Sequence, residues 1–196
     1  ERGNLAVELY DASIADGVAH RLEGEFNRLN VAAAMAVGRY FGVDEERIRD
    51  AIAAYLPENN RSQRQRTACN TLIVDCYNAN PISMKASIDV LNMAIGRRVA
   101  VLGNMGELGD TAEVLHAEVG TYAAQQNVDL VCGIGDLTHA LVEEASRGTH
   151  TQALWFADNE SFIQAIPDII KDGDNVLVKA SHGMNFPQIV HALEEL

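Results

Sequence analysis

Cysteine is scarce in this chain: its 196 residues contain three, Cys69, Cys76 and Cys132. Neither the odd number nor the spacing suits a disulfide framework or a zinc site, so we expect reduced thiols in core or loop positions. Long apolar runs are also missing. No stretch of about 18 apolar residues is available to span a bilayer, and residues 1–17 lack the hydrophobic region of a signal peptide. We expect a cytoplasmic protein without membrane insertion.

Positive charge is in short supply as well. Lysine and arginine together number 15 against 28 aspartates and glutamates, which gives a formal net charge of −13. Nucleic-acid binding needs clustered basic side chains, so a nucleic-acid partner is not expected. Arg61, Arg64 and Arg66 form one basic cluster, which a solvated strand or loop would explain equally well. With 47% hydrophobic and 22% charged residues, the composition is that of a globular protein.

Glycine-rich loops that hold nucleotide phosphates are absent or incomplete. No Gly-Lys pair occurs, so the phosphate loop G-x-x-G-K-[ST] is missing. Glycines 103, 106 and 109 have the wrong spacing for a dinucleotide loop, and Gly133-Ile134-Gly135 is followed by Thr138 where a third glycine or alanine is needed. A nicotinamide or flavin oxidoreductase is therefore a weak hypothesis.

The first 60 residues predict helices and little sheet. Helices are expected over residues 28–41 and 44–55, with Asn27 and Asp44 as candidate N-caps, and weak strands over residues 5–10 and 20–22. Pro57, Asn59 and Asn60 then interrupt the pattern. We place a domain boundary there, which gives domains of residues 1–60 and 61–196.

Beyond this boundary, strand and helix patterns alternate. Strands are expected at residues 63–68, 71–75, 98–102, 130–132, 151–155 and 175–179, and helices at 83–94, 111–126, 136–147, 160–170 and 185–196. Repeated strand–helix units with short connections predict an α/β fold. The expected form is a Rossmann-like, mostly parallel sheet with helices on both faces, preceded by the helical segment.

The most informative stretch is residues 71–84, TLIVDCYNANPISM. Leu72-Ile73-Val74 is typical of a strand buried on both faces, and the strand is expected to end at Asp75. Ligands of open α/β sheets bind past the carboxyl ends of strands, where Asp75 could accept a hydrogen bond from a ribose or a similar hydroxyl. An ordinary strand, turn and helix would also explain the pattern.

Residues 74–84, VDCYNANPISM, resemble the signature D-x-Y-N-A-N-P-x-S-M of the Mur ligase family, specifically of its UDP-N-acetylmuramoyl-tripeptide:D-alanyl-D-alanine ligases. Segments 24–30, 57–63, 101–109 and 176–184 extend the resemblance over residues 20–196. Three positions depart from the family pattern. Phe26 replaces histidine or tyrosine, Asn104 replaces aspartate and Ala180 replaces glycine.

The resemblance implies two groups of site residues. Those implied to contact ATP are Asn27, Asn30, Arg61, Asp75, Tyr77, Asn78 and Asn80, and those near the peptide substrate are Lys179, Ser181 and His182. Simpler explanations stand beside several of them: Asn27 as a helix cap, Arg61 and Lys179 as solvated cations. His116, which also matches the family, would alone be a packed or surface histidine. No metal ligand and no catalytic residue is assigned within this chain.

The implied parent enzyme uses ATP and Mg²⁺ to join D-alanyl-D-alanine to UDP-N-acetylmuramoyl-tripeptide in peptidoglycan synthesis, through an acyl phosphate. Its phosphate loop and magnesium ligands would lie upstream of residue 24, so the chain is expected to be a C-terminal fragment that is inactive alone. Residues 61–196 would then act as a lid over ATP, with the linker 56–62 as hinge. The alternative is a stand-alone α/β module that binds a nucleotide or peptide without ligase activity.

Overall fold

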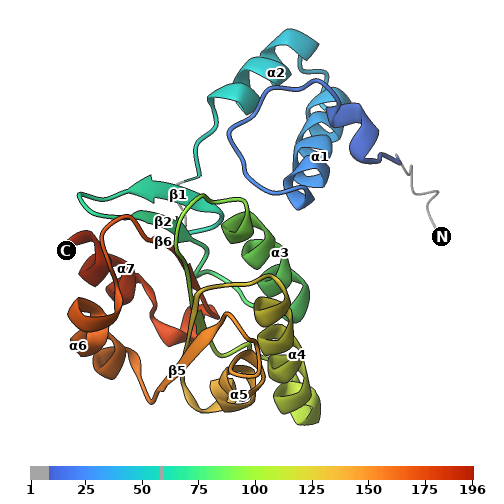
Figure 1. Ribbon diagram of the computed structural model, residues 1–196. Helices are drawn as coiled ribbons and strands as arrows, with labels where there is room; N and C mark the ends of the chain where they lie inside the picture. The colour runs from blue at the N-terminus through green and yellow to red at the C-terminus, as the bar shows by residue number, and fades with distance from the viewer. Residues whose placement is uncertain (1–8, 58–59) are drawn as a thin grey trace. The chain divides into compact units, whose positions relative to one another are not determined.

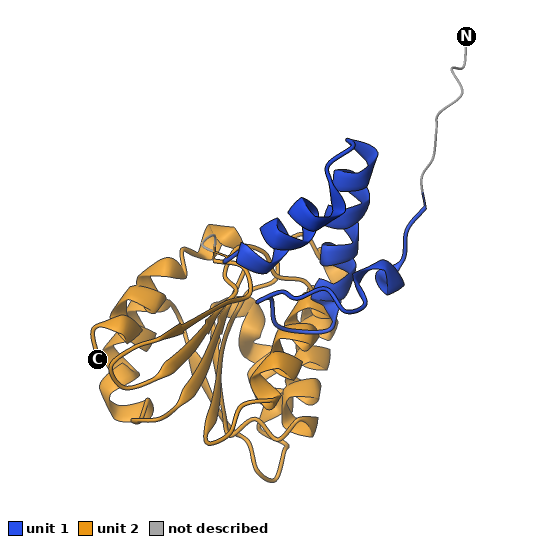
Figure 2. Cartoon of the chain, turned by 90° about the horizontal axis from the view of Figure 1, so that it is seen from above, with its two compact units in different colours: residues 1–56 blue, residues 57–196 orange. Residues whose placement is uncertain are grey.

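The computed structural model describes residues 9–57 and 60–196. The chain divides into two compact units, residues 1–56 and 57–196, which Figure 2 shows in separate colours. Composition places the boundary a few residues later, at 60/61. Part of the predicted linker, residues 58 and 59, lies outside the described residues.

The first unit is built from two helices, α1 (Phe26–Tyr40) and α2 (Glu45–Ala54), and a 3-10 turn η1 (Ala12–Ala15). Their buried side chains form a small core: Ala15, Val18, Val31, Ala32, Met35 and Ile48. Asp44 caps α2 as predicted, because its carboxylate accepts a hydrogen bond from the Glu46 amide at 3.0 Å. Both predicted helices are confirmed, with ends shifted by a residue or two.

Other expectations for this unit are wrong. Asn27 does not cap α1, because the helix begins one residue earlier and Asn27 lies buried in its first turn, where its amide donates to the Glu23 carbonyl at 2.6 Å. Residues 20–22 form no strand, since the described part of this unit offers no second strand to pair with them. Of the strand predicted at 5–10, residues 5–8 lie outside the described residues, and Leu9 and Tyr10 are not in a strand.

The second unit is organised around a six-stranded sheet with the order β1-β2-β6-β3-β4-β5. Its strands are β1 (Gln63–Arg66), β2 (Thr71–Val74), β3 (Arg98–Gly103), β4 (Leu130–Ile134), β5 (Gln152–Phe156) and β6 (Asn175–Lys179). Only β1 is antiparallel, and it pairs with β2 across the turn at Cys69-Asn70, as predicted. The Rossmann-like prediction is therefore confirmed.

Helices cover both faces of this sheet (Figure 1). One face carries α3 (Pro81–Asn92), α4 (Ala112–Gln125) and α5 (His139–Ala145), and the other carries α6 (Asn159–Ile169) and α7 (Pro187–Glu194). Short 3-10 turns lie at η2 (Gly109–Thr111), η3 (Asp136–Thr138) and η4 (His182–Met184). Right-handed crossovers between parallel strands require helices of this kind.

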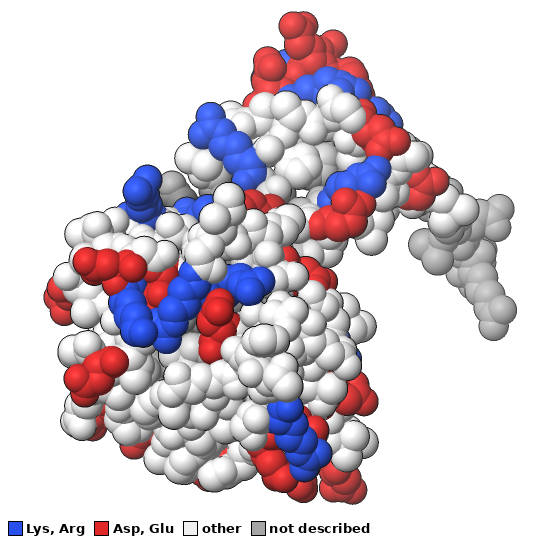
Figure 3. Space-filling view, in the orientation of Figure 1, with Lys and Arg blue, Asp and Glu red and all other residues white. Residues whose placement is uncertain are grey.

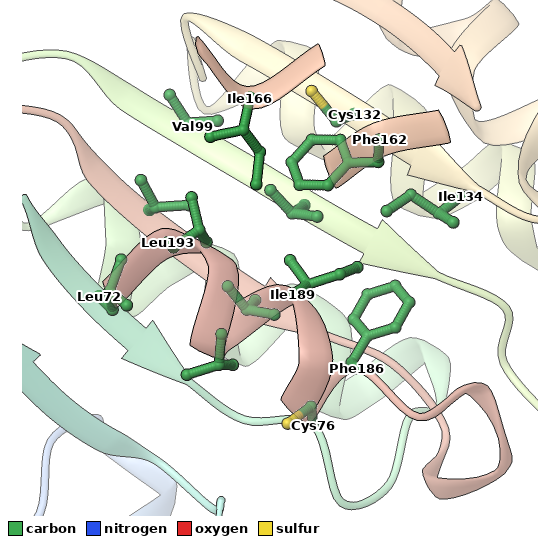
Figure 4. Packing of buried hydrophobic residues seen from close by; sticks show 14 of the residues in the cluster. Leu72, Cys76, Val99, Cys132, Ile134, Phe162, Ile166, Phe186, Ile189 and Leu193 are labelled. Carbon is green, nitrogen blue, oxygen red and sulfur yellow. The ribbon is translucent and has the colours of Figure 1, made fainter. Parts of the chain in front are cut away.

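Each face of the sheet has its own apolar core, because alternate residues of a strand point to opposite faces. Leu72 and Val74 of β2 pack toward α6 and α7, whereas Ile73 packs toward α3. Figure 4 shows the α6 and α7 side, where Phe162, Phe186 and Ile189 lie over the sheet and Cys76 lies beside α7. Burial raises the pKa of the Cys76 thiol to about 11 and that of Cys132 to about 12. Both are free thiols, as predicted, and are protonated at neutral pH.

Basic and acidic side chains are interspersed over the face shown in Figure 3. Within residues 9–57 and 60–196, no helix has both the length and the hydrophobicity that crossing a bilayer requires.

Candidate functional site

The candidate site lies at the carboxyl edge of the sheet, where β2, β6 and β3 end side by side. Asp75 follows β2, Lys179 ends β6 and Asn104 follows β3. From this edge the chain turns to opposite faces: β2 and β3 lead to α3 and α4, and β6 leads to α7. Loops that diverge in this way open a crevice, and such crevices hold the ligands of open α/β sheets.

Asp75 and Lys179 occupy matching positions on neighbouring strands. Val74 pairs with Val178, and the Asp75 amide donates to the Val178 carbonyl at 2.9 Å, so the parallel ladder continues to Asp75. Strand alternation then directs both side chains to the face that α3 covers. There the Lys179 Nζ lies 2.5 Å from Asp75 Oδ2 and 3.0 Å from the carbonyl oxygen of Asn78.

The Asp75 carboxylate has two further partners. Ser87 of α3 donates its hydroxyl to Oδ2 at 2.8 Å, and the Ser62 amide donates to Oδ1 at 3.2 Å. A carboxylate that accepts several hydrogen bonds holds its donors in one arrangement. Asp75 therefore joins the segment before β1, the middle of α3 and the end of β6.

Lys179 is buried, with 1% of its surface exposed. Burial lowers the pKa of its ammonium below the ordinary value, while the neighbouring Asp75 carboxylate opposes that effect. Two of its three N–H donors are accounted for by Asp75 and Asn78. The simpler explanation of Lys179 as a solvated cation is therefore wrong.

Three residues from separate segments are in contact at this edge of the sheet. The Arg61 guanidinium lies 3.6 Å from the centroid of the Tyr77 ring, and the Tyr77 and His182 ring centroids are 5.5 Å apart. All three residues are exposed. An exposed guanidinium that contacts an aromatic ring through a cation–π interaction still offers N–H donors, which suit phosphate or carboxylate oxygens.

The loop from Asp75 to α3 ends in a strong helix start. Asn80 accepts a hydrogen bond from the Ser83 amide at 2.8 Å, and the Ser83 hydroxyl accepts one from the Asn80 amide at 3.1 Å, which forms a capping box with Pro81 at the first helical position. The Asn80 side chain therefore serves the helix. Asn78 is exposed, and its backbone carbonyl is the acceptor for Lys179.

The loop after β3 supports the turn that follows Lys179. The Gly106 amide donates to the Ser181 hydroxyl oxygen at 2.9 Å, and the Ser181 amide donates to the Asn104 carbonyl at 3.3 Å. His116 anchors this loop from α4, because its Nε2 accepts from the Met105 amide at 2.9 Å while Nδ1 donates to the Ala112 carbonyl at 2.7 Å. His116 is fully buried, so its packed role is confirmed, and burial lowers its pKa.

A family model described as "Mur ligase, glutamate ligase domain" matches residues 60–182 of this chain. This chain belongs to the Mur ligase family. The matched segment begins just before Arg61 and ends at His182, so it spans every candidate site residue of the second unit.

Relatives within the Mur ligase family agree with this assignment. The UDP-N-acetylmuramoyl-tripeptide–D-alanyl-D-alanine ligase of Bacillus subtilis is 32% identical over 176 residues, which cover 88% of this chain and 38% of the relative. A crystal structure of MurF from Acinetobacter baumannii superposes with a TM-score of 0.79 at 29% identity, over 90% of this chain and 40% of that one. MurF ligase from Thermotoga maritima, solved in complex with ADP, gives a TM-score of 0.74 over 89% of this chain and 39% of that one, and at 24% identity it bears on the fold alone.

The chain thus spans well under half the length of these Mur ligases. The structure itself shows where the residues inferred from the family signature lie. Eight of them lie together at the carboxyl edge of the second unit: Arg61, Asp75, Tyr77, Asn78, Asn80, Lys179, Ser181 and His182.

Asn27 and Asn30 belong to the first unit. The Asn30 amide donates to Asn27 Oδ1 at 2.9 Å, so the two side chains form a pair at the start of α1. Asn27 is 4% exposed and Asn30 is exposed, which leaves Asn30 as the more accessible amide of the pair.

Metal binding has no support among the described residues, which contain no group of three or more His, Cys, Asp or Glu side chains arranged around a common point. Mg²⁺ prefers several carboxylate oxygens and waters in octahedral geometry. Asp75, the carboxylate of the site, is instead paired with Lys179. The residues present do not fit a resident magnesium ion.

The three departures from the Mur ligase pattern have different surroundings. Ala180 is fully buried, and a Cβ added at Gly103 would lie 2.7 Å from the Ala180 Cβ, so the alanine fits beside a residue without a side chain. The Oδ1 atom of Asn104 is buried without a hydrogen-bond partner. Phe26, on the first unit, is 40% exposed at the start of α1.

Sequence reasoning did not find Ser62 and Ser87. Ser87 carries a usable signal, because it is a polar residue at a helix position between the buried Met84 and Leu91, where an apolar side chain is the rule. Ser62 contributes only its backbone amide, so its side-chain type gives no signal at all.

Proposed function

We propose that this chain is the C-terminal part of an ATP-dependent ligase that adds D-alanyl-D-alanine to UDP-N-acetylmuramoyl-tripeptide in peptidoglycan synthesis, through an acyl phosphate. The observation that carries the proposal is the convergence of three sequence-distant segments at one sheet edge: Arg61, the loop 75–80 and the turn 179–182. Reactions of this type depend on positioning and charge stabilisation, which such a convergence supplies.

The proposed site residues divide between nucleotide and peptide. Arg61, Asp75, Tyr77, Asn78 and Asn80 are proposed to form the ATP side, with Asn27 and Asn30 as contacts to the base. The stacked guanidinium of Arg61 supports this, since it suits a phosphate oxygen. Ser181 and His182 are proposed to face the peptide substrate, because both lie in the turn past β6 and His182 is exposed. ATP enters with Mg²⁺, for which the ligands are proposed to lie in the parent enzyme outside this chain.

The two units are proposed to belong to different domains of the parent. Residues 1–60 would be the end of the central ATP-binding domain, and residues 61–196 the C-terminal ligase domain, which acts as a lid in the cytoplasm. The exposed apolar side chains of α1 support the first assignment: Phe26, Leu29, Val37 and Tyr40 are 40–67% exposed and follow helical spacing along one side. A helix with apolar residues on that side as well as on its buried side suits the interior of a larger domain.

Phosphate release tests the activity. The complete ligase is supplied with ATP, Mg²⁺, UDP-N-acetylmuramoyl-tripeptide and D-alanyl-D-alanine, and the 196-residue chain is assayed in parallel. We expect release that requires both substrates in the complete ligase and no release from the chain alone. Release without the dipeptide requirement would contradict the assignment, and micromolar binding of ADP by the chain alone would favour a stand-alone binding module.

A further inference from the structure

The ammonium of Lys179 binds groups of the protein itself. It ends β6, is 1% exposed, and lies against Asp75 Oδ2 and the Asn78 carbonyl, both in the loop that follows β2. Asp75 is in turn held by Ser87 on α3 and by the Ser62 amide. A side chain so placed reaches substrate only if the loop 75–80 first moves away.

We propose that Lys179 is a positioning residue: it acts on the reaction through Asp75 and Asn78, and it couples the shape of the loop 75–80 to the turn 181–182. The expected effect on the kinetics rests on the proposed function. The role of the buried ammonium in holding the loop 75–80 in place does not depend on the proposed function.

The geometry favours this role over direct substrate contact. A buried ion pair adds little net stability compared with apolar residues of similar volume, so an apolar side chain would serve packing as well. The ammonium of Lys179 instead fixes the path of the loop 75–80. It binds the Asp75 carboxylate and also the backbone carbonyl of Asn78, three residues further along the loop. A loop with those two points fixed has little freedom left between them.

Lys179 also directly precedes the turn that carries Ser181 and His182. Ser181 comes two residues after Lys179 and is held by Gly106, while the His182 ring lies beside the Tyr77 ring of the loop 75–80. Tyr77 lies between Asp75 and Asn78, the two residues that Lys179 contacts. Displacement of the loop therefore moves the ring against which His182 packs, and the nucleotide side and peptide side of the site shift together.

Hydrogen exchange on the 196-residue chain tests the structural content. Lys179→Met keeps the volume and removes the ammonium. We expect amide exchange to become at least about tenfold faster at Ser62, Asp75 and Asn80, whose N–H groups are hydrogen-bonded to or beside the loop 75–80. The control is Lys85→Met, which removes a lysine from a surface ion pair with Glu118 and is expected to leave exchange at these three amides unchanged. If Lys179→Met does not fold, Asp75→Asn/Lys179→Met removes both charges and is still expected to show the faster exchange. Unchanged exchange in a folded variant would overturn the proposal.

Kinetics on the complete ligase test the coupling. For Lys179→Met we expect the KM values for ATP and for D-alanyl-D-alanine both to rise, each about tenfold, because both sides of the site lose their common support. A rise confined to the dipeptide KM would mean direct substrate contact and would overturn the positioning role. If the unmutated complete protein shows no ligase activity, the proposed function fails, and the exchange experiment still decides the role of Lys179.

Discussion

The guanidinium carbon of Arg61 lies over the ring of Tyr77, 3.6 Å from its centroid. Arg61 precedes β1 and Tyr77 follows β2, so the hairpin formed by these two strands brings the pair together. The stack restricts a long, exposed side chain before any ligand arrives, and less conformational entropy is then lost on binding.

Removing the ring should weaken nucleotide binding without unfolding the protein. In the complete ligase, Tyr77→Leu is expected to raise the KM for ATP about two- to fivefold, because an exposed cation–π contact contributes about 0.5–1 kcal/mol. Steady-state kinetics at saturating dipeptide measure the effect. Tyr77→Phe keeps the ring and should behave like the unmutated enzyme; an equal loss in both variants would point to the hydroxyl and contradict the stacking role.

Asp75→Ala should lower the free energy of unfolding as well as change the kinetics. It leaves the Lys179 ammonium buried without its carboxylate, and the loss of one partner of a buried pair costs about 3–5 kcal/mol. Urea unfolding of the 196-residue chain measures the loss. Asp75→Asn/Lys179→Met, in which neither charge remains, should recover part of it, and equal stabilities of the two variants would contradict the pair's role.

His116 predicts a dependence of stability on pH. Burial lowers its pKa below 6.5, so between the lowered value and 6.5 the unfolded chain binds more protons than the folded chain. Its stabilising contribution is therefore complete above 6.5 and is lost as pH falls through the lower, folded-state pKa. Protonation would also remove the acceptor for the Met105 amide.

The measurement is the free energy of unfolding against pH for the unmutated chain and for His116→Asn. The difference in free energy of unfolding between the unmutated chain and His116→Asn should become smaller as the pH falls below 6.5. His191→Asn, at an exposed histidine of α7, is the matched control and should run parallel to the unmutated chain. Parallel curves for His116→Asn as well would contradict the prediction.

Restoring the family residue at position 104 should destabilise this chain. Oδ1 of Asn104 is buried without a donor, and Asn104→Asp would place a negative charge there with no hydrogen bond to stabilise it. We expect a loss of about 1–3 kcal/mol in urea unfolding, the usual cost of an unsatisfied buried polar group. Asn104→Ala removes the unsatisfied atom and should lose less. Greater stability of Asn104→Asp than of the unmutated chain would refute this account.

Local patterns were sufficient to predict the frame of the second unit. The apolar run Val176–Val178 and the helix start at Asn80-Pro81 have their causes in neighbouring residues. The strand lies where the sequence predicts it, and the helix begins two residues before its predicted start at residue 83. The contacts of Asp75 have a different origin. Its partner Lys179 is 104 residues away, and the two meet only because β6 inserts between β2 and β3, an order that no local pattern encodes. The prediction that Asn27 caps α1 was wrong for a different reason. Asparagine suits a helix cap, but Asn27 is buried by tertiary contacts and lies inside the first turn of the helix.

The antiparallel strand β1 forms one edge of the sheet. Its sequence, Gln63-Arg64-Gln65-Arg66, has no apolar side chain, and both arginines are exposed. Another chain that paired with this outer edge would have to bring its backbone against charged side chains and would bury no hydrocarbon in return, which is how natural proteins discourage edge-to-edge aggregation. The strand that carries Arg61 toward Tyr77 thus also protects the sheet from growing into a larger assembly.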